Sequence, residues 1–181
     1  MREHGRRALV SVLACVGLSS VAGALAADDW NACAMLKRAD VEAAFASYHF
    51  EEGSPGRAVV TNSPKAASVS TCSYTARGAT PKETVTVSLL ARRAPGDTSG
   101  TTPEAARAGA VQLKATPVDV AGLGPGAYWV NLGSSALPSV QLNVFRGKRD
   151  WLVIGVTARS LDSQAALEGL RKIANGLVAR P

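Results

Sequence analysis

The sequence is poor in the side chains that carry most enzyme chemistry. Its 181 residues include only two histidines and three cysteines, and aromatic residues make up 5% of the chain. His4 and Cys15 fall within the first 26 residues, so His49 is the one histidine beyond them. A Ser or Cys triad needs a histidine and an orienting acid beside an exposed nucleophile, and the sequence contains no G-x-S-x-G segment. This composition argues against the common triad hydrolases.

The sequence also contains few residues suited to binding a metal ion or a nucleic acid. The sequence has no C-x-x-C pair, and one histidine beyond residue 26 leaves too few soft ligands for a zinc site. The basic residues come in short scattered groups without the interleaved aromatic side chains that stack on bases. The net charge of +6 would fall to +4 without residues 1–26. We therefore expect no cofactor, no metal and no nucleic acid, and only a weak attraction to anionic envelope surfaces.

The N-terminus has the pattern of a secretory signal peptide. Basic residues in 1–7 precede an apolar run over 8–27, and Ala24-Leu25-Ala26 provides the small-x-small pattern of a cleavage site. We predict a signal peptide over residues 1–26, cleavage after Ala26 or Ala27, and a periplasmic or secreted product. Three alternatives stay open: a twin-arginine signal at Arg6-Arg7, a lipobox ending at Cys15, and an uncleaved membrane anchor of about 20 residues.

Cys33 and Cys72 form an even pair in a segment that we expect to enter an oxidising compartment. Such pairs are joined as disulfides, and the spacing excludes the usual redox motif. Closing a loop of about 40 residues would stabilise the fold by roughly 4 kcal/mol in the chain-entropy model. The length and the apolar fraction of 46% suit one domain over residues 27–181.

Hydrophobic periodicity predicts an α+β fold with the order α-β-β-α-β-β-β-α. Helices are expected over residues 28–47 with a break near Lys37, over 102–114, and from a cap at Ser160 or Asp162 to near the C-terminus. Strands are expected over residues 68–76, 84–89, 127–131, 140–145 and 151–157, and the last two form a hairpin. We expect an antiparallel sheet of about five strands with its helices packed on one face.

The glycine-rich segment 122–126 is the first candidate binding site. It superficially resembles a phosphate-binding loop, but Pro125 removes a backbone donor and a strand follows instead of a helix. A tight turn is the simpler interpretation, although the loop could rim a binding groove beside two aromatic residues. The candidate ligand or partner residues are Gly122, Gly124, Gly126, Tyr128 and Trp129.

A small periplasmic hydrolase is the alternative hypothesis. It would use His49 with Glu51 or Glu52, so it requires these groups to converge in one pocket. Their setting before Gly53 and Pro55 favours a solvated turn instead.

Four marks in a fixed order resemble a known set of proteins. They are Cys33-Ala34-Met35-Leu36 with Asp40-Val41, Cys72-Ser73-Tyr74, Gly122-Leu123-Gly124 with Ala127-Tyr128-Trp129, and the closing hairpin and helix. In these the chain resembles uncharacterised bacterial periplasmic and lipoprotein domains. The resemblance implies a bridge between Cys33 and Cys72 and a sheet-and-helix fold, and it implies no activity. The sequence differs from that pattern in lacking a clear lipobox and in placing Lys37 where a capping Ser or Thr is expected.

These observations favour an exported, non-catalytic binding or interaction module of the bacterial envelope. Its partner would be an unidentified envelope protein or a small ligand, bound through a sheet face or the glycine-rich loop. A passive structural component of the envelope is a further hypothesis that the residues leave open.

Overall fold

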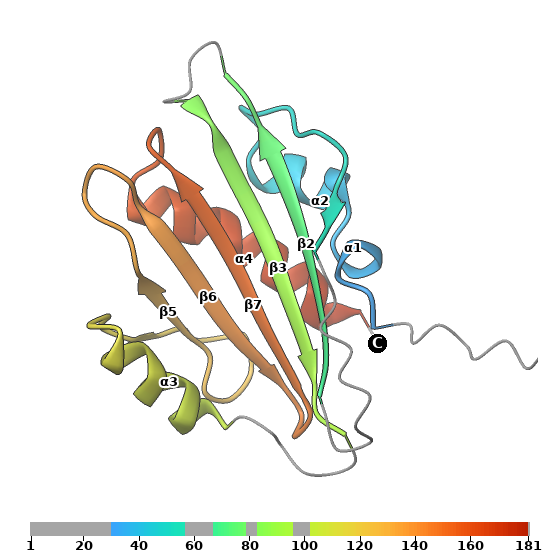
Figure 1. Ribbon diagram of the computed structural model, residues 1–181, viewed down its shortest axis with the longest axis vertical. Helices are drawn as coiled ribbons and strands as arrows, with labels where there is room; N and C mark the ends of the chain where they lie inside the picture. The colour runs from blue at the N-terminus through green and yellow to red at the C-terminus, as the bar shows by residue number, and fades with distance from the viewer. Residues whose placement is uncertain (1–29, 57–66, 79–82, 96–101, 181) are drawn as a thin grey trace, which may run out of the picture.

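A computed structural model describes residues 30–56, 67–78, 83–95 and 102–180 (Figure 1). Its helices are α1 (Ala32–Met35), α2 (Arg38–Ala44), α3 (Pro103–Gln112) and α4 (Ser163–Ala179). Its strands are β1 (Ser54–Pro55), β2 (Ser68–Ala76), β3 (Val85–Arg93), β4 (Val118–Asp119), β5 (Tyr128–Asn131), β6 (Ser139–Arg146) and β7 (Asp150–Ala158). The predicted signal peptide lies outside the described residues.

The strands form one antiparallel sheet in the order β1-β2-β3-β7-β6-β5-β4. The predicted α+β class with an antiparallel sheet is thus confirmed. The expected number of about five strands was too low, because the two edge strands β1 and β4 add a pair of residues each. Strands this short show no alternation of polar and apolar residues, so the sequence carries no periodic signal for them.

The first predicted helix is two short helices that break at Leu36 and Lys37, as expected near Lys37. Lys37 lacks a capping hydroxyl, and its backbone N–H instead donates to Oδ2 of Asp40 at 3.0 Å. At the other end of the chain, the side chain of Asp162 accepts the backbone N–H groups of Gln164 and Ala165 and starts α4. Of the two caps considered for this helix, the structure uses Asp162.

The main core lies between the sheet and α4. Alternate residues of β3, such as Val85, Val87 and Leu89, are fully buried in the same cluster as the apolar stripe of the helix. Gly169 lets α4 approach Phe45 closely, since a Cβ atom there would lie 2.4 Å from the phenyl ring. Burial of this stripe stabilises the fold because it removes apolar surface from water.

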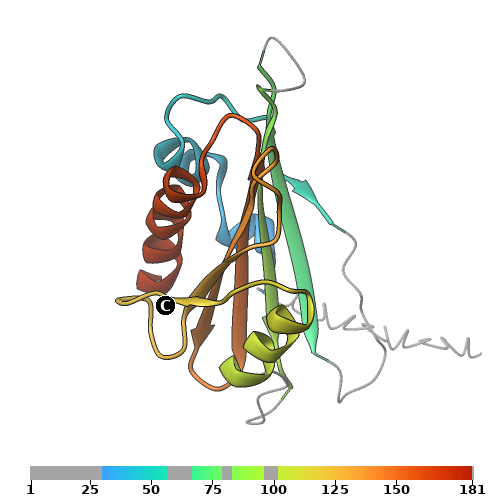
Figure 2. The ribbon, with the colours of Figure 1, turned by 90° about the vertical axis from the view of Figure 1, so that its left-hand side faces the viewer.

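The expectation that all helices share one face of the sheet was wrong for α3. Helices α1, α2 and α4 lie along one face, whereas α3 lies by itself near one end of the sheet (Figure 2). Ala106 and Ala110 of α3 pack with Tyr128 and Val130, whose side chains point away from α4. This helix is made largely of small residues, so it has no apolar stripe from which the sequence could indicate the face of the sheet that it covers.

The predicted disulfide is present and ties α1 to β2. Cys33 and Cys72 are bonded with their Cα atoms 5.0 Å apart. Two hydrogen bonds reinforce the same junction: Ala32 N–H donates to Oγ of Ser70 at 3.0 Å, and the Tyr74 hydroxyl donates to the carbonyl of Leu36. The N-terminal part of the described chain is thus fixed covalently and by polar contacts. Across the described residues, no helix has the length and apolar character to cross a membrane.

Candidate functional site

The face of the sheet turned away from α4 changes character along the strands. Near the start of β3 and the end of β7 it carries small polar side chains, including Thr86, Ser88 and Thr157. Toward the other end of the same strands it becomes apolar at Leu90 and Val153, which lie opposite each other. The apolar end is where α3 crosses the sheet.

Arg107 fixes α3 to this end of the sheet. Its guanidinium pairs with Asp119 of β4 and lies over the ring of Tyr128, 4.7 Å from the ring centroid. Near the start of the helix, Gly126 has a positive φ of 76°, and a Cβ atom there would lie 2.6 Å from Pro103. A larger residue at Gly126 would push the helix away, so this glycine permits the close approach.

Between α3 and the sheet lies an open groove of about 710 Å³. Its residues come from α3, the turn after it, strands β3, β5, β6 and β7, and the residue that follows β5, and none of them is charged. They are Leu90, Ala105, Ala106, Gly109, Ala110, Leu113, Tyr128, Val130, Leu132, Gln141, Asn143, Trp151 and Val153. A groove of this volume with apolar walls and few polar groups is typical of small-molecule sites.

Aromatic rings and one buried amide form the floor of the groove and its surroundings. Trp151 stacks on Phe145 with the ring planes 1° apart, and Phe145 in turn lies beside Tyr128. The Trp151 indole N–H donates to Oδ1 of Asn143 at 3.1 Å, and Asn143 is 3% exposed. Burial raises the pKa of Tyr128 above its usual value although Arg107 acts in the opposite direction, so its hydroxyl stays neutral. The floor is thus aromatic and uncharged.

The structure separates the residues that the sequence grouped as a binding site. Tyr128 lines the groove, but Trp129 points to the opposite face and packs against the main core. Gly126 instead lines a small pocket of about 260 Å³ beside the β6–β7 hairpin. Gly122 and Gly124 are exposed and adopt the positive φ values of a tight turn. Of the five candidate residues, Tyr128 lines the groove.

The residues of the hydrolase hypothesis lie outside the groove. His49 is exposed, and Glu51 and Glu52 pair with different arginines, Arg77 at 3.2 Å and Arg38 at 2.6 Å. The Glu51 and Glu52 side chains are 60% and 82% exposed. These groups do not converge in a pocket, and the structure gives the hypothesis no support.

Several groove residues were not predicted from the sequence. Gln141 and Asn143 occupy alternate positions of a strand, and Gly109 and Leu113 lie on or just after a helix. The available signal was indirect: Leu90 and Val153 are apolar residues on the face that an amphipathic strand normally leaves polar. That irregularity marks a second covered region on the sheet.

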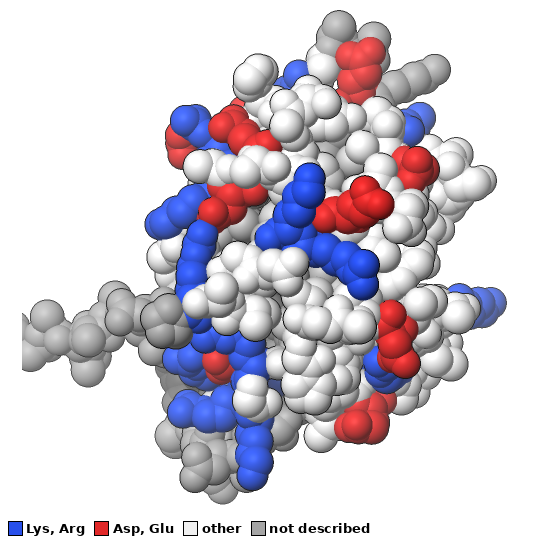
Figure 3. Space-filling view, turned by 180° about the vertical axis from the view of Figure 1, so that it is seen from behind, with Lys and Arg blue, Asp and Glu red and all other residues white. Residues whose placement is uncertain are grey.

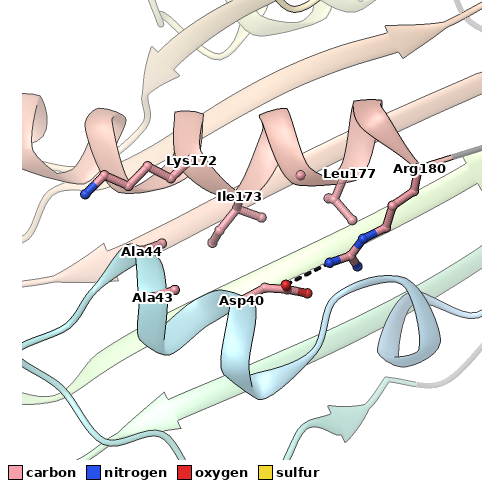
Figure 4. Close-up of a pocket in the computed structure, with 8 residues that line it drawn as sticks. Asp40, Ala43, Ala44, Lys172, Ile173, Leu177 and Arg180 are labelled. Carbon is pink, nitrogen blue, oxygen red and sulfur yellow. Dashed lines mark hydrogen bonds and ion pairs between the residues drawn. The ribbon is translucent and has the colours of Figure 1, made fainter.

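A second hollow lies between α2 and α4 and has a volume of about 220 Å³. Figure 4 shows Arg180 reaching from the end of α4 to Asp40, while the amino group of Lys172 points away from that pair. Arg180 and Asp40 satisfy each other here and the hollow is much smaller than the groove, so it offers less to a ligand. Among the described residues no group of three or more His, Cys, Asp or Glu side chains could hold a metal ion.

Comparison with known proteins adds little. No family model matches the chain, and no curated protein matches it. Among solved structures, it is similar to the crystal structure of the extracellular domain of PknH from Mycobacterium tuberculosis. That likeness has 13% sequence identity and a TM-score of 0.42, and it covers 81% of this chain and 94% of the other.

Proposed function

We propose that the protein is an exported, non-catalytic binding module whose groove between α3 and the sheet takes an uncharged, largely apolar small molecule. The observation that carries the proposal is a groove of about 710 Å³ without a charged residue in its lining. The disulfide between Cys33 and Cys72 supports an oxidising compartment, as the sequence pattern of residues 1–26 predicts.

The lining favours a neutral ligand for an electrostatic reason. A charged group placed there would lose part of its hydration and find no charged side chain in the lining to compensate it, which is unfavourable in an apolar site. Gln141 and Asn143 offer amide groups to a single polar group of a ligand, while Leu90, Val153 and Trp151 offer apolar area. The expected ligand is thus apolar along most of its length and carries a neutral hydrogen-bonding group.

Binding of Nile red, an uncharged apolar dye, tests the proposal. The dye should bind saturably, and Gly109→Phe should weaken its binding about tenfold or more by filling the groove. A Cβ atom at Gly109 meets nothing within 4 Å, so the new side chain does not have to displace the helix. Ala108→Phe is the matched control because Ala108 is exposed on the same helix and does not line the groove.

Equal dye binding by both variants, or no saturable binding by the wild-type protein, would rule out the groove as the site. Mass spectrometry of an organic extract of the protein, purified from its native host, would then identify the natural ligand. An extract that contains one enriched neutral compound from the wild type but not from Gly109→Phe supports the proposal.

A further inference from the structure

Another pocket lies on the opposite side of the sheet from the groove, at the end of the sheet where β6 and β7 form their hairpin. It measures about 260 Å³ and is lined by Trp30, Ala34, Met35, Arg93, Arg146, Leu177 and Arg180. In the view of the α4 side, basic side chains gather at this end of the molecule (Figure 3). The proposed function does not use this pocket.

All polar side chains in the lining are hydrogen-bond donors without an acceptor atom. Arginine and tryptophan side chains can donate but cannot accept. Trp30 is 8% exposed, and its indole Nε1 is buried without a hydrogen-bond partner among the described residues. A buried donor without a partner is costly, so this pocket favours a ligand that brings acceptor atoms.

The charges at the pocket leave one positive charge in excess. Arg93, Asp150 and Arg146 lie side by side on three neighbouring strands, where Arg93 is paired with Asp150 and Asp150 with Arg146 in the sheet register. The carboxylate of Asp150 accepts two hydrogen bonds from Arg93, both at 2.8 Å, and thereby neutralises it. Arg146 donates only to a neutral group, the carbonyl of Leu177 at 3.3 Å, and makes no ion pair with a described residue.

The other charged and aromatic members of the lining are held in place. Arg180 donates to Oδ1 of Asp40 at 2.7 Å and to the carbonyl of Met35 at 2.6 Å, which neutralises its charge (Figure 4). The guanidinium of Arg93 lies over the indole of Trp30, 3.9 Å from the ring centroid. The pocket is thus preorganised, and Arg146 supplies its uncompensated charge.

We propose that this pocket binds the oxyanion of an amphipathic monoanion, either a carboxylate or a phosphodiester. The anionic oxygens accept from Arg146 and from the indole N–H of Trp30, and the apolar part contacts Met35 and Leu177. One negative charge matches the single excess positive charge. Two sources share this chemistry: a soluble amphipathic acid and the headgroup of an anionic phospholipid.

The sequence itself supports the membrane source. Only Asp28 and Asp29 separate Trp30 from the apolar run over residues 8–27. Any form of the protein that keeps this run would hold the pocket close to the bilayer surface. Anionic lipid headgroups would then be present at high local concentration.

The test follows the indole N–H resonance of Trp30 by NMR in the protein purified after export, assigned through the Trp30→Phe variant. On titration with octanoate or dioctanoyl phosphatidylglycerol, this resonance should shift downfield and saturate, while those of Trp129 and Trp151 stay in place. Arg146→Gln should weaken binding about tenfold or more, since a charge-assisted hydrogen bond is lost. Arg159→Gln is the matched control, because Arg159 is exposed and follows the opposite end of β7.

The outcomes separate the two sources. Saturable binding of the short-chain lipid, with flotation on phosphatidylglycerol but not phosphatidylcholine vesicles, assigns the site to an anionic lipid. Octanoate binding without flotation assigns it to a soluble acid. If neither probe moves the Trp30 resonance, or if the two arginine variants lose affinity equally, the proposal is overturned.

Discussion

Arg180, the last residue but one of the chain, donates through Nη2 to Oδ1 of Asp40 in α2, with a donor–acceptor distance of 2.7 Å. The bond joins two segments 140 residues apart in the sequence and fastens the end of α4 to the N-terminal helices. It also makes part of the stability of the fold depend on pH in the acid range, because it lowers the pKa of Asp40.

Asp40→Asn should lower the free energy of unfolding by about 1 kcal/mol or less at pH 7. Burial acts to raise the pKa of Asp40, but hydrogen bonds from Arg180 and the Lys37 N–H outweigh it and lower that pKa below its ordinary value of 3.8. A lowered folded-state pKa contributes stability above the ordinary value and loses it as the pH falls through the folded value. Urea unfolding should therefore show the difference at pH 7 and its loss well below pH 3.8. Glu52→Gln, at an 82% exposed carboxylate, should show no such difference.

Reduction of the disulfide between Cys33 and Cys72 should lower the free energy of unfolding by about 3 to 4 kcal/mol. The two residues are 39 positions apart, and the lost loop constraint sets this magnitude. Denaturant titrations of the oxidised and of the reduced, alkylated protein measure it. Equal midpoints would mean that α1 is held to β2 without the covalent bond.

Two glycines of α4 should respond in opposite directions to alanine. Gly169→Ala should destabilise the protein by about 1 to 3 kcal/mol, since the added Cβ would meet the ring of Phe45 at 2.4 Å. Gly176→Ala should stabilise it by about 0.5 to 1 kcal/mol, because a Cβ there meets nothing within 4 Å and alanine favours the helix. Thermal unfolding of both variants checks the close approach of α4 to Phe45. A shift of the same sign in both would contradict it.

Tyr74→Phe should lower the free energy of unfolding by about 1 to 3 kcal/mol, because it leaves the buried carbonyl of Leu36 without the hydroxyl that donates to it. Tyr48→Phe is the control, since its hydroxyl bonds to Ser160 at the surface and should contribute little.

Burial, followed by the charges of Glu52 and Asp40, also raises the pKa of Tyr74 above 10.0. Stability from this group is therefore complete below pH 10 and decreases as the pH rises through the folded-state pKa. Ultraviolet titration of wild type and Tyr74→Phe would detect the late phenolate.

Local patterns predicted most of the elements. The alternation of Val85, Val87 and Leu89 indicated a half-buried strand, and the glycine between Arg146 and Asp150 indicated a hairpin, which Gly147 closes with a φ of 58°. Such signals are short-range because they arise from the periods of strands and helices. The edge strands β1 and β4 gave none, since their pairing depends on a neighbour and not on their own residues.

The candidate site was harder to predict because its parts are not contiguous. Tyr128 was recognised as an aromatic residue of interest, but Gln141, Asn143 and Gly109 were not. They face one groove only because β5, β6 and α3 meet at one end of the sheet. The glycine-rich loop attracted attention by composition, yet its glycines mainly allow a tight turn and the approach of Pro103.

The sequence by itself determined the apolar stripe of α4, the alternating strands and the pair of cysteines, because each depends on residue type and spacing along the chain. Only the tertiary structure decided that α3 crosses the face opposite α4 and leaves an uncharged groove. It alone brought Trp30, Arg146 and Arg180 to one pocket. The local sequence of a helix or strand does not specify which face of the sheet it covers or which segment it pairs with. Packing between distant segments decides this, and it depends on the whole buried surface.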